Sequence, residues 1–208
     1  MNDESTNVLH PKVKPLLVIL SGLSGVGKDV VLNGLRSSGY PLEFIITLTT
    51  RPQRPNEKDG IHYHFVSSTR FQELIQDNQL LEWANVYGNW YGVPRESVKQ
   101  SLADGKDTVI KIDVQGASTI KKILPQAVFI FLATPTMKEL EQRLTQRRTE
   151  TPSDLDLRLK TAGKELESLS MFDYLVFNRR DEIDRAVADV LSIINAEKCR
   201  VIPRELSL

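Results

Sequence analysis

One stretch near the start of the chain constrains the fold more than any other. An apolar run, Leu16 to Leu20, is followed by Gly22-Leu23-Ser24-Gly25-Val26-Gly27-Lys28, which matches the pattern G-x-x-x-x-G-K. The apolar run is typical of a buried parallel strand, and we expect a helix from about Lys28 to about Gly39. A strand, a glycine-rich loop and a helix in this order form a phosphate loop. Its backbone N–H groups and the positive end of the helix surround phosphate oxygens.

The end of this motif carries its charged chemistry. Lys28 is the cation that reaches the β- and γ-phosphates of a nucleotide. The next position usually holds a serine or threonine that binds Mg²⁺, but here it is Asp29. A carboxylate is also a good Mg²⁺ ligand, so we interpret Asp29 as a metal ligand, direct or through water. Alternatively, Asp29 only complements the positive end of the helix.

The rest of the chain alternates short apolar runs with helical patterns. We predict strands at 44–49, 107–113, 128–132 and 174–177, with helices at about 97–102, 116–123, 135–147, 153–170 and 183–194. This alternation predicts an α/β fold with a central five-stranded parallel sheet flanked by helices. Residues 50–95 interrupt it with a proline-rich segment and short strand patterns, which indicates an inserted small α+β lobe. The core would then comprise residues 15–49 and 96–208, after a loosely ordered extension at 1–14.

Composition excludes several classes of protein. The 27 basic and 27 acidic residues give a formal net charge of zero, which argues against a nucleic-acid binder. The single cysteine excludes an intramolecular disulfide and a multi-cysteine metal site. No apolar run approaches the ~18 residues of a membrane span, and we find no signal peptide. We therefore expect a cytoplasmic protein without membrane contact, whose oligomeric state the sequence leaves open.

The predicted lobe carries a second group of polar residues. Arg51 and Arg54 lie three apart on an extended segment, which suits a phosphate dianion because guanidinium groups bind phosphate oxygens in pairs. The Tyr63 hydroxyl adds a neutral donor. Glu82 could accept two hydrogen bonds from the N1/N2 edge of guanine, a pattern that adenine does not present.

With these residues the chain resembles the guanylate kinase family over roughly residues 16–197. The resemblance rests on SGLSGVGK, TLTTRPQRPNEKDGIHYHFVS, LLEWANVYGNWYG, KIDVQGA and RRTETPSDLDLRL, and on Asn178 after the last strand. It implies a P-loop kinase fold with a GMP-binding lobe at 50–95 and a short lid at about 148–155. The implied reaction is the Mg²⁺-dependent transfer of a phosphoryl group from ATP to GMP.

The resemblance also implies a role for each matched position. ATP would bind to the phosphate loop and the residue after it, and its adenine would lie beside Asn178. The loop positions are Gly22, Leu23, Ser24, Gly25, Val26, Gly27, Lys28 and Asp29. The GMP phosphate would bind to Arg51, Arg54, Tyr63 and Tyr91, while Glu82 and Thr47 read the guanine. Asp113 would lie near GMP and the water around the metal. The catalytic cations would be Lys28, Arg51, Arg158 and the lid residues Arg147 and Arg148.

Three positions depart from the family pattern. Asp29 replaces the hydroxyl residue, Val93 replaces a serine or threonine that helps to read guanine, and Lys111 replaces an acid two residues before Asp113. Asp29 and Lys111 both fall at the carboxyl edge of the predicted sheet, where ligands bind. We hypothesise that the acid has moved from strand to helix and that Lys111 pairs with Asp29 or a phosphate. Two unrelated substitutions are the alternative.

Two other functions stay open at this point. A non-catalytic guanylate-kinase-like interaction domain is compatible with Asp29, although the intact loop from Gly22 to Lys28 counts against it. A P-loop kinase for another phosphorylated acceptor is the second alternative, against which Glu82 and the two tyrosines favour GMP.

Overall fold

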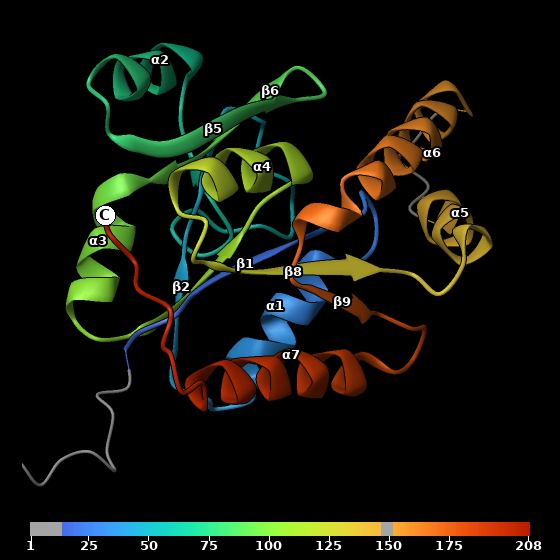
Figure 1. Ribbon diagram of the computed structural model, residues 1–208. Coiled ribbons are helices and arrows are strands. Elements are labelled where there is room, and N and C mark those ends of the chain that lie inside the picture. Colours follow the sequence, from blue (N-terminus) through green and yellow to red (C-terminus); the bar gives the residue numbers. More distant parts are fainter. Residues whose placement is uncertain (1–13, 147–151) are drawn as a thin grey trace, which may run out of the picture.

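The main sheet of the protein has five parallel strands (Figure 1). The computed structural model describes residues 14–146 and 152–208. Strand β1 (Leu17–Gly22) lies at the centre, between β7 (Asp107–Lys111) with β2 (Leu42–Ile45) and β8 (Val128–Ala133) with β9 (Tyr174–Phe177). Every neighbouring pair is parallel. The predicted five-stranded parallel sheet is therefore confirmed, whereas nearly all of the expected extension at 1–14 lies outside the described residues.

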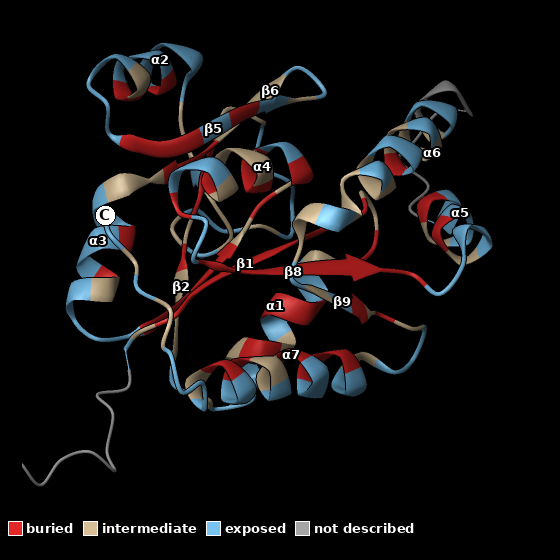
Figure 2. Ribbon diagram, viewed as in Figure 1, coloured by how far each residue is buried: buried red, intermediate tan, exposed pale blue. Residues whose placement is uncertain are grey.

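Helices cover both faces of this sheet. Helices α1 (Lys28–Ser37) and α7 (Ile183–Lys198) pack on one face, and α3 (Arg95–Ala103) and α4 (Val114–Ile123) pack on the other. Along β1, Val18 and Leu20 belong to the first core, while Leu17 and Ile19 belong to the second. Because both faces are covered, the strand is apolar from Leu17 to Leu20 and buried along its whole length (Figure 2). Helices α5 (Met137–Gln146) and α6 (Pro152–Glu167) pack against each other beyond the end of β8.

A second sheet is formed by residues 48–94. Its four strands lie in the order β4 (His64–Phe65), β3 (Leu48–Thr49), β6 (Asn89–Pro94) and β5 (Leu80–Val86), and α2 (Ser68–Gln76) packs on it. This lobe has a small core of its own, built around Leu48, Phe71, Leu74 and Leu80. The lobe can therefore hold its side chains in fixed positions without belonging to the main sheet.

The single strand predicted at residues 44–49 is wrong. The chain leaves the main sheet after Ile45 and enters the lobe sheet at Leu48. Ile45 packs in the same core as Ile110, whereas Leu48 packs with Phe71 in the lobe. An apolar pattern indicates that both ends of a segment are buried, but it does not indicate whether they are buried in the same core.

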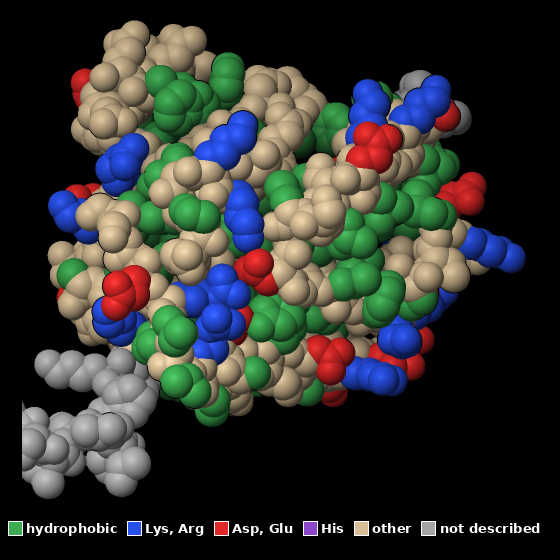
Figure 3. Space-filling view, viewed as in Figure 1, with side chains coloured by type: hydrophobic (Ala, Val, Ile, Leu, Met, Phe, Trp, Pro, Cys, Tyr) green, Lys and Arg blue, Asp and Glu red, His purple; other side chains and the backbone are tan. Residues whose placement is uncertain are grey.

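The surface mixes charges of both signs. Basic and acidic side chains both occur on the face shown in Figure 3, in keeping with the net charge of zero. Within the ranges 14–146 and 152–208, no helix combines the length and the apolar character needed to cross a membrane.

Gly22, the last residue of β1 and the first of the phosphate loop, packs closely against β8, and this contact generates a prediction. Gly22 has a φ of +135°, and a Cβ atom added there would lie 2.1 Å from the carbonyl oxygen of Leu132. We expect Gly22→Ala to lower the free energy of unfolding by about 3–4 kcal/mol, because backbone atoms must shift. The measurement is urea unfolding.

Gly39→Ala is the matched control. Gly39 also has a positive φ, +73°, but no atom lies within 4 Å of the added Cβ. Its substitution should therefore cost only the conformational penalty, about 1–2 kcal/mol. Equal losses in the two variants would show that the close approach to β8 is not what requires glycine at position 22.

Candidate active site

A cavity of about 590 Å³ lies between the phosphate loop, the inserted lobe and α6. It brings together many of the residues that the sequence predicts as site residues: Ser24, Gly25, Gly27, Lys28, Asp29, Thr47, Arg54, Tyr63, Tyr91, Asp113 and Arg158. Arg147 and Arg148 lie outside the described residues. Residues from the first half of the chain, from the segment after β7 and from α6 therefore meet around one space.

The phosphate loop wraps around the Lys28 side chain. The Lys28 ammonium group donates hydrogen bonds to the carbonyl oxygens of Gly22 (2.8 Å) and Leu23 (3.1 Å). Gly25 and Gly27 have φ values of +87° and +95°, which side chains with a Cβ rarely adopt. Burial lowers the pKa of Lys28, and nearby carboxylates oppose this effect. The loop therefore presents a desolvated cation that favours an anionic ligand.

Asn178 and Arg143 hold the phosphate loop in place at Val26. The side-chain amide of Asn178 donates to the carbonyl oxygen of Val26 (2.8 Å), and its backbone carbonyl accepts a hydrogen bond from Arg143 (2.7 Å). Arg143, which comes from α5, also donates to the Val26 carbonyl (2.8 Å). The sequence reasoning missed Arg143, because nothing in its local pattern shows that α5 packs against the loop. The amide of Asn178, for which we expected an adenine neighbour, lies against the loop backbone.

Glu165 is a second residue that the sequence reasoning missed. It comes from α6, and its Oε2 accepts a hydrogen bond from the backbone N–H of Ser24 (2.8 Å). Burial raises the pKa of Glu165, and the Lys28 charge and the Ser24 N–H offset part of this rise. A signal was available, since Arg158 and Glu165 are seven residues apart and so share one helix face. The contact shows that this N–H of the loop is directed so that it can bind an oxyanion.

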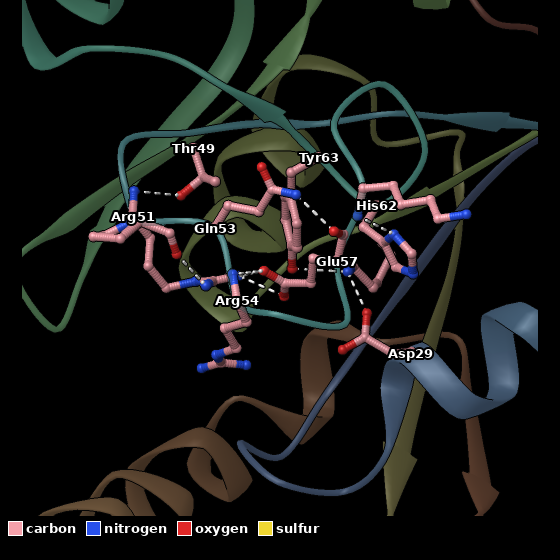
Figure 4. Close-up of polar contacts among 11 residues, drawn as sticks. Asp29, Thr49, Arg51, Gln53, Arg54, Glu57, His62 and Tyr63 are labelled. Atoms are coloured by element: carbon pink, nitrogen blue, oxygen red, sulfur yellow. Dashed lines mark hydrogen bonds and ion pairs between the residues drawn. The ribbon is translucent and has the colours of Figure 1, made fainter. Parts of the chain in front are cut away.

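Glu57 organises the two arginines of the lobe (Figure 4). One terminal nitrogen of Arg51 donates to both carboxylate oxygens of Glu57, at 2.7 and 2.9 Å. The backbone N–H of Arg54 donates to the same carboxylate (2.9 Å). Burial opposes the ionisation of Glu57, but these hydrogen bonds hold its pKa below the ordinary value. The Arg54 guanidinium group points away from this pair and lines the cavity. The lobe therefore offers one arginine held in place and one directed at the cavity.

Lys111 joins the phosphate-loop helix to the lobe. Its ammonium group donates to Asp29 Oδ1 (2.5 Å) and to the Tyr63 hydroxyl (2.8 Å). Burial alone would lower the pKa of Lys111, but Tyr63 and Asp29 reverse the effect and raise it. The hypothesis that Lys111 pairs with Asp29 is therefore confirmed by the geometry.

Glu82 is an acid without a complete set of partners. It lies on β5 with 2% of its surface exposed, and its Oε2 is buried without a hydrogen-bond partner. Burial, assisted by the negative charge of Asp113, raises the pKa of Glu82 to about 8. A Cβ atom on Gly116 of α4 would lie 2.8 Å from this oxygen, so the glycine makes room for the carboxylate. Val93, which pairs with Glu82 across the hairpin, is fully buried in the core that α3 and α4 cover.

Two carboxylates on the cavity wall have the chemistry of a Mg²⁺ site. Asp29 lies in the first turn of α1, and Asp113 accepts hydrogen bonds from the N–H groups of Gln115 (2.7 Å) and Gly116 (3.1 Å) at the start of α4. Among the described residues, no group of three or more His, Cys, Asp or Glu could hold a metal alone. A Mg²⁺ ion bound here would be held partly by these carboxylates and partly by phosphate oxygens of the nucleotide, as this ion usually is.

The phosphate loop and the separate lobe that faces it across the cavity place the chain in the class of P-loop kinases. A family model described as "Guanylate kinase" matches residues 14–197, and the chain belongs to this family. It is 46% identical over 186 residues to the guanylate kinase of Desulfitobacterium hafniense (strain Y51), covering 89% of this chain and 92% of the relative. The predicted resemblance is therefore confirmed.

Two further comparisons agree. The chain is 40% identical over 205 residues to guanylate kinase 2, chloroplastic/mitochondrial, of Oryza sativa subsp. japonica, covering 98% of this chain and 72% of the relative. The crystal structure of guanylate kinase from Anaplasma phagocytophilum is 30% identical in sequence and superposes with a TM-score of 0.75. That match covers 91% of this chain and 88% of the other, so the predicted fold class is confirmed as well.

The raised pKa of Glu82 generates a prediction about stability. Unfolded, this carboxyl ionises near its ordinary pKa of 4.5, and folded it ionises near 8. Between about pH 4.5 and about pH 8, Glu82 keeps its proton in the folded state but has lost it in the unfolded state. The free energy of unfolding therefore falls as the pH rises through this range. We expect nucleotide-free Glu82→Gln to match the wild type at pH 4.5 but to exceed its free energy of unfolding by about 2–4 kcal/mol at pH 8.5.

Urea unfolding at the two pH values is the measurement, with Glu167→Gln on the exposed end of α6 as the control. The control should change stability little at either pH. A gain for Glu82→Gln that is the same at both pH values would contradict the assignment of a buried, protonated acid.

Proposed function

We propose that this protein phosphorylates GMP to GDP, with ATP as the phosphoryl donor. The observation that carries the proposal is the buried, unpartnered Oε2 of Glu82, beside the cavity into which the phosphate loop opens. Glu82 packs against Gly116, and the neighbouring Val114 and Gln115 line the cavity. An acceptor group that is buried without a donor is costly, and a ligand that supplies N–H donors removes that cost.

Guanine is the purine base that supplies these donors. Its N1–H and N2–H groups lie side by side, so one carboxylate can accept from both, whereas adenine presents an acceptor at N1. Thr47, which is 5% exposed and lines the cavity, adds a hydroxyl group to the cavity wall. Because Val93 is turned into the core, discrimination between the bases rests on Glu82 and Thr47.

The lobe would bind the phosphate of GMP. Arg54, Tyr63 and Tyr91 line the cavity, and Arg51 lies behind them in contact with Glu57. One oxygen of the GMP phosphate would then attack the γ-phosphorus of ATP while the bond to ADP breaks. No side chain has to act as a nucleophile, because the GMP phosphate is already ionised near neutral pH. The protein contributes position and positive charge.

The donor side would be bound by the phosphate loop. The loop N–H groups and Lys28 would hold the phosphates of ATP, and Asn178 would keep the loop in shape next to the adenine. Glu165 occupies the Ser24 N–H, so this carboxylate would have to give way to a phosphate oxygen. Asp29 and Asp113 would hold Mg²⁺, which neutralises phosphate charge when it is bound.

The lid would complete the site from α6. Arg158 lines the cavity, and its guanidinium lies 5.4 Å from the ring centre of Tyr87 at the tip of the β5–β6 hairpin. This contact joins α6 to the lobe across the cavity, so closure of the two would exclude water from the transfer. From the sequence, Arg147 and Arg148 would add further positive charge to the transferring group.

A panel of nucleoside monophosphates tests the proposal. ADP formation from ATP would be measured with GMP, AMP, CMP and UMP at equal concentrations in a coupled assay. We expect turnover with GMP to exceed that with the other three by at least about a hundredfold. Faster turnover with any other acceptor would refute the assignment of GMP.

Near neutral pH Glu82 is protonated in the free protein, and we infer that guanine, whose two N–H groups need an acceptor, displaces this proton when it binds. Replacement of the carboxyl group should therefore damage the use of GMP specifically. We expect Glu82→Gln to lower kcat/KM for GMP by about 2–4 kcal/mol in transition-state free energy, because the carboxylate accepts from both N–H donors of guanine. The residual rate with AMP should change far less. Steady-state kinetics with both nucleotides would show this, and Glu167→Gln serves again as the control. A variant with near-native kcat/KM for GMP would exclude Glu82 as the reader of the base.

The arginine of the lobe should not be replaceable by lysine. We expect Arg51→Lys to be nearly as harmful to kcat/KM as Arg51→Ala, because a planar guanidinium can bind Glu57 and a phosphate together and an ammonium group cannot match that geometry. The matched control is Arg70→Lys on α2, where the arginine forms an exposed ion pair with Glu73. Full activity of Arg51→Lys would remove Arg51 from the phosphate site.

A further inference from the structure

The Lys111 ammonium group occupies a junction between the two halves of the site. Its side chain is 10% exposed, and its nitrogen contacts Asp29 on α1 and Tyr63 in the lobe. The nitrogen also lies 4.3 Å from the ring centre of Tyr63. Figure 4 shows the dashed contacts that reach the Asp29 carboxylate and the Tyr63 hydroxyl. A strand end, the phosphate-loop helix and the lobe are thus held together by one cation.

The chemistry of the ammonium group fixes the direction of the Tyr63 hydrogen bond. An ammonium group has three donors and no acceptor, so the Tyr63 oxygen must be the acceptor in their contact at 2.8 Å. The hydroxyl proton of Tyr63 is then directed elsewhere. Tyr63 lines the cavity, so its proton is available to a ligand there.

Asp29 in turn restrains Lys111. A lysine side chain has four rotatable bonds and is not held by a single contact to a hydroxyl group. The Asp29 carboxylate, 2.5 Å from the nitrogen, supplies the second contact. The Asp29 side chain is 65% exposed, so this ion pair is partly screened by water and its contribution is modest.

On the basis of the proposed function, we propose that Lys111 is a positioning residue for GMP. It accepts no hydrogen bond itself, and it holds the Tyr63 hydroxyl so that the tyrosine donates its proton to the GMP phosphate. Asp29 keeps Lys111 in this place. Two of the three departures from the family pattern, Asp29 and Lys111, then act together to orient Tyr63.

A double-mutant cycle on GMP binding tests the proposal. The dissociation constant for GMP would be measured by calorimetry, without ATP or Mg²⁺, for wild type, Lys111→Met, Tyr63→Phe and the double variant. We expect each single substitution to weaken binding about tenfold, because each removes the oriented, charge-assisted donor. The double variant should be no weaker than Tyr63→Phe alone, since Lys111 acts through the tyrosine.

Guanosine separates positioning from a general loss of structure. It carries the base but no phosphate, so Lys111→Met should leave the dissociation constant of guanosine unchanged. In steady-state kinetics the loss should fall on the KM for GMP and leave kcat nearly intact. Lys121→Met is the matched control, because Lys121 also contacts a carboxylate, Asp173 (3.1 Å), and a ring, Phe129 (4.2 Å), but on α4 away from the cavity. The control should bind GMP as the wild type does.

Asp29→Ala provides a second variant, whose exposed position makes it compatible with folding even if Lys111→Met does not fold. We expect it to weaken GMP binding about threefold, and this loss should vanish in the Tyr63→Phe background. Losses that multiply in the double variants, or a loss of guanosine binding equal to that of GMP, would overturn the inference alone. A wild type that neither binds nor converts GMP would overturn the proposed function together with it.

Discussion

The backbone contact between the phosphate loop and β8 is the constraint on which the site depends. The N–H of Leu23 donates to the carbonyl oxygen of Leu132 (3.1 Å), and the same carbonyl leaves no room for a side chain at Gly22. On the other side of the loop, Asn178 and Arg143 both donate to Val26. Fixed in this way at both ends, the loop keeps its N–H groups pointing in set directions. The lobe and α6 then complete the cavity around a loop whose position is fixed.

Buried charge is the second theme of the site, and it explains how a ligand gains affinity. Lys28, Lys111, Glu82 and Glu165 are all desolvated, and burial opposes the charged form of each. Asp29 and Tyr63 stabilise the charged form of Lys111 enough to outweigh its burial. Ser24 and Lys28 stabilise the charged form of Glu165 in part. The Oε2 of Glu82 has no such partner. A nucleotide with phosphates and N–H donors satisfies groups that the free protein leaves costly, which favours binding of that nucleotide over others.

Local sequence patterns predicted the elements well where one core buries the whole segment. Strand β1, the phosphate loop and the start of α1 follow from a continuous apolar run and correctly spaced glycines. The prediction failed at residues 44–49, where two cores share one apolar run. It also missed Glu165 and Arg143, whose partners in the loop lie more than a hundred residues away along the chain. Such contacts depend on which helices pack together, and a local pattern does not contain that information.

The sequence by itself determined the chemistry of this protein: a phosphate loop with Lys28, a lobe with paired arginines, and an acid suited to guanine. It also placed Asp29 and Lys111 at one edge of the sheet, because the carboxyl ends of parallel strands share an edge. Only the tertiary structure decided that the Lys111 nitrogen reaches Asp29 and Tyr63 together, and that Glu82 is buried with one oxygen unpartnered. The physical reason is that residue type and spacing fix what a group can donate or accept. Which groups lie within hydrogen-bond distance, and which are removed from water, depends on how elements distant in sequence pack together.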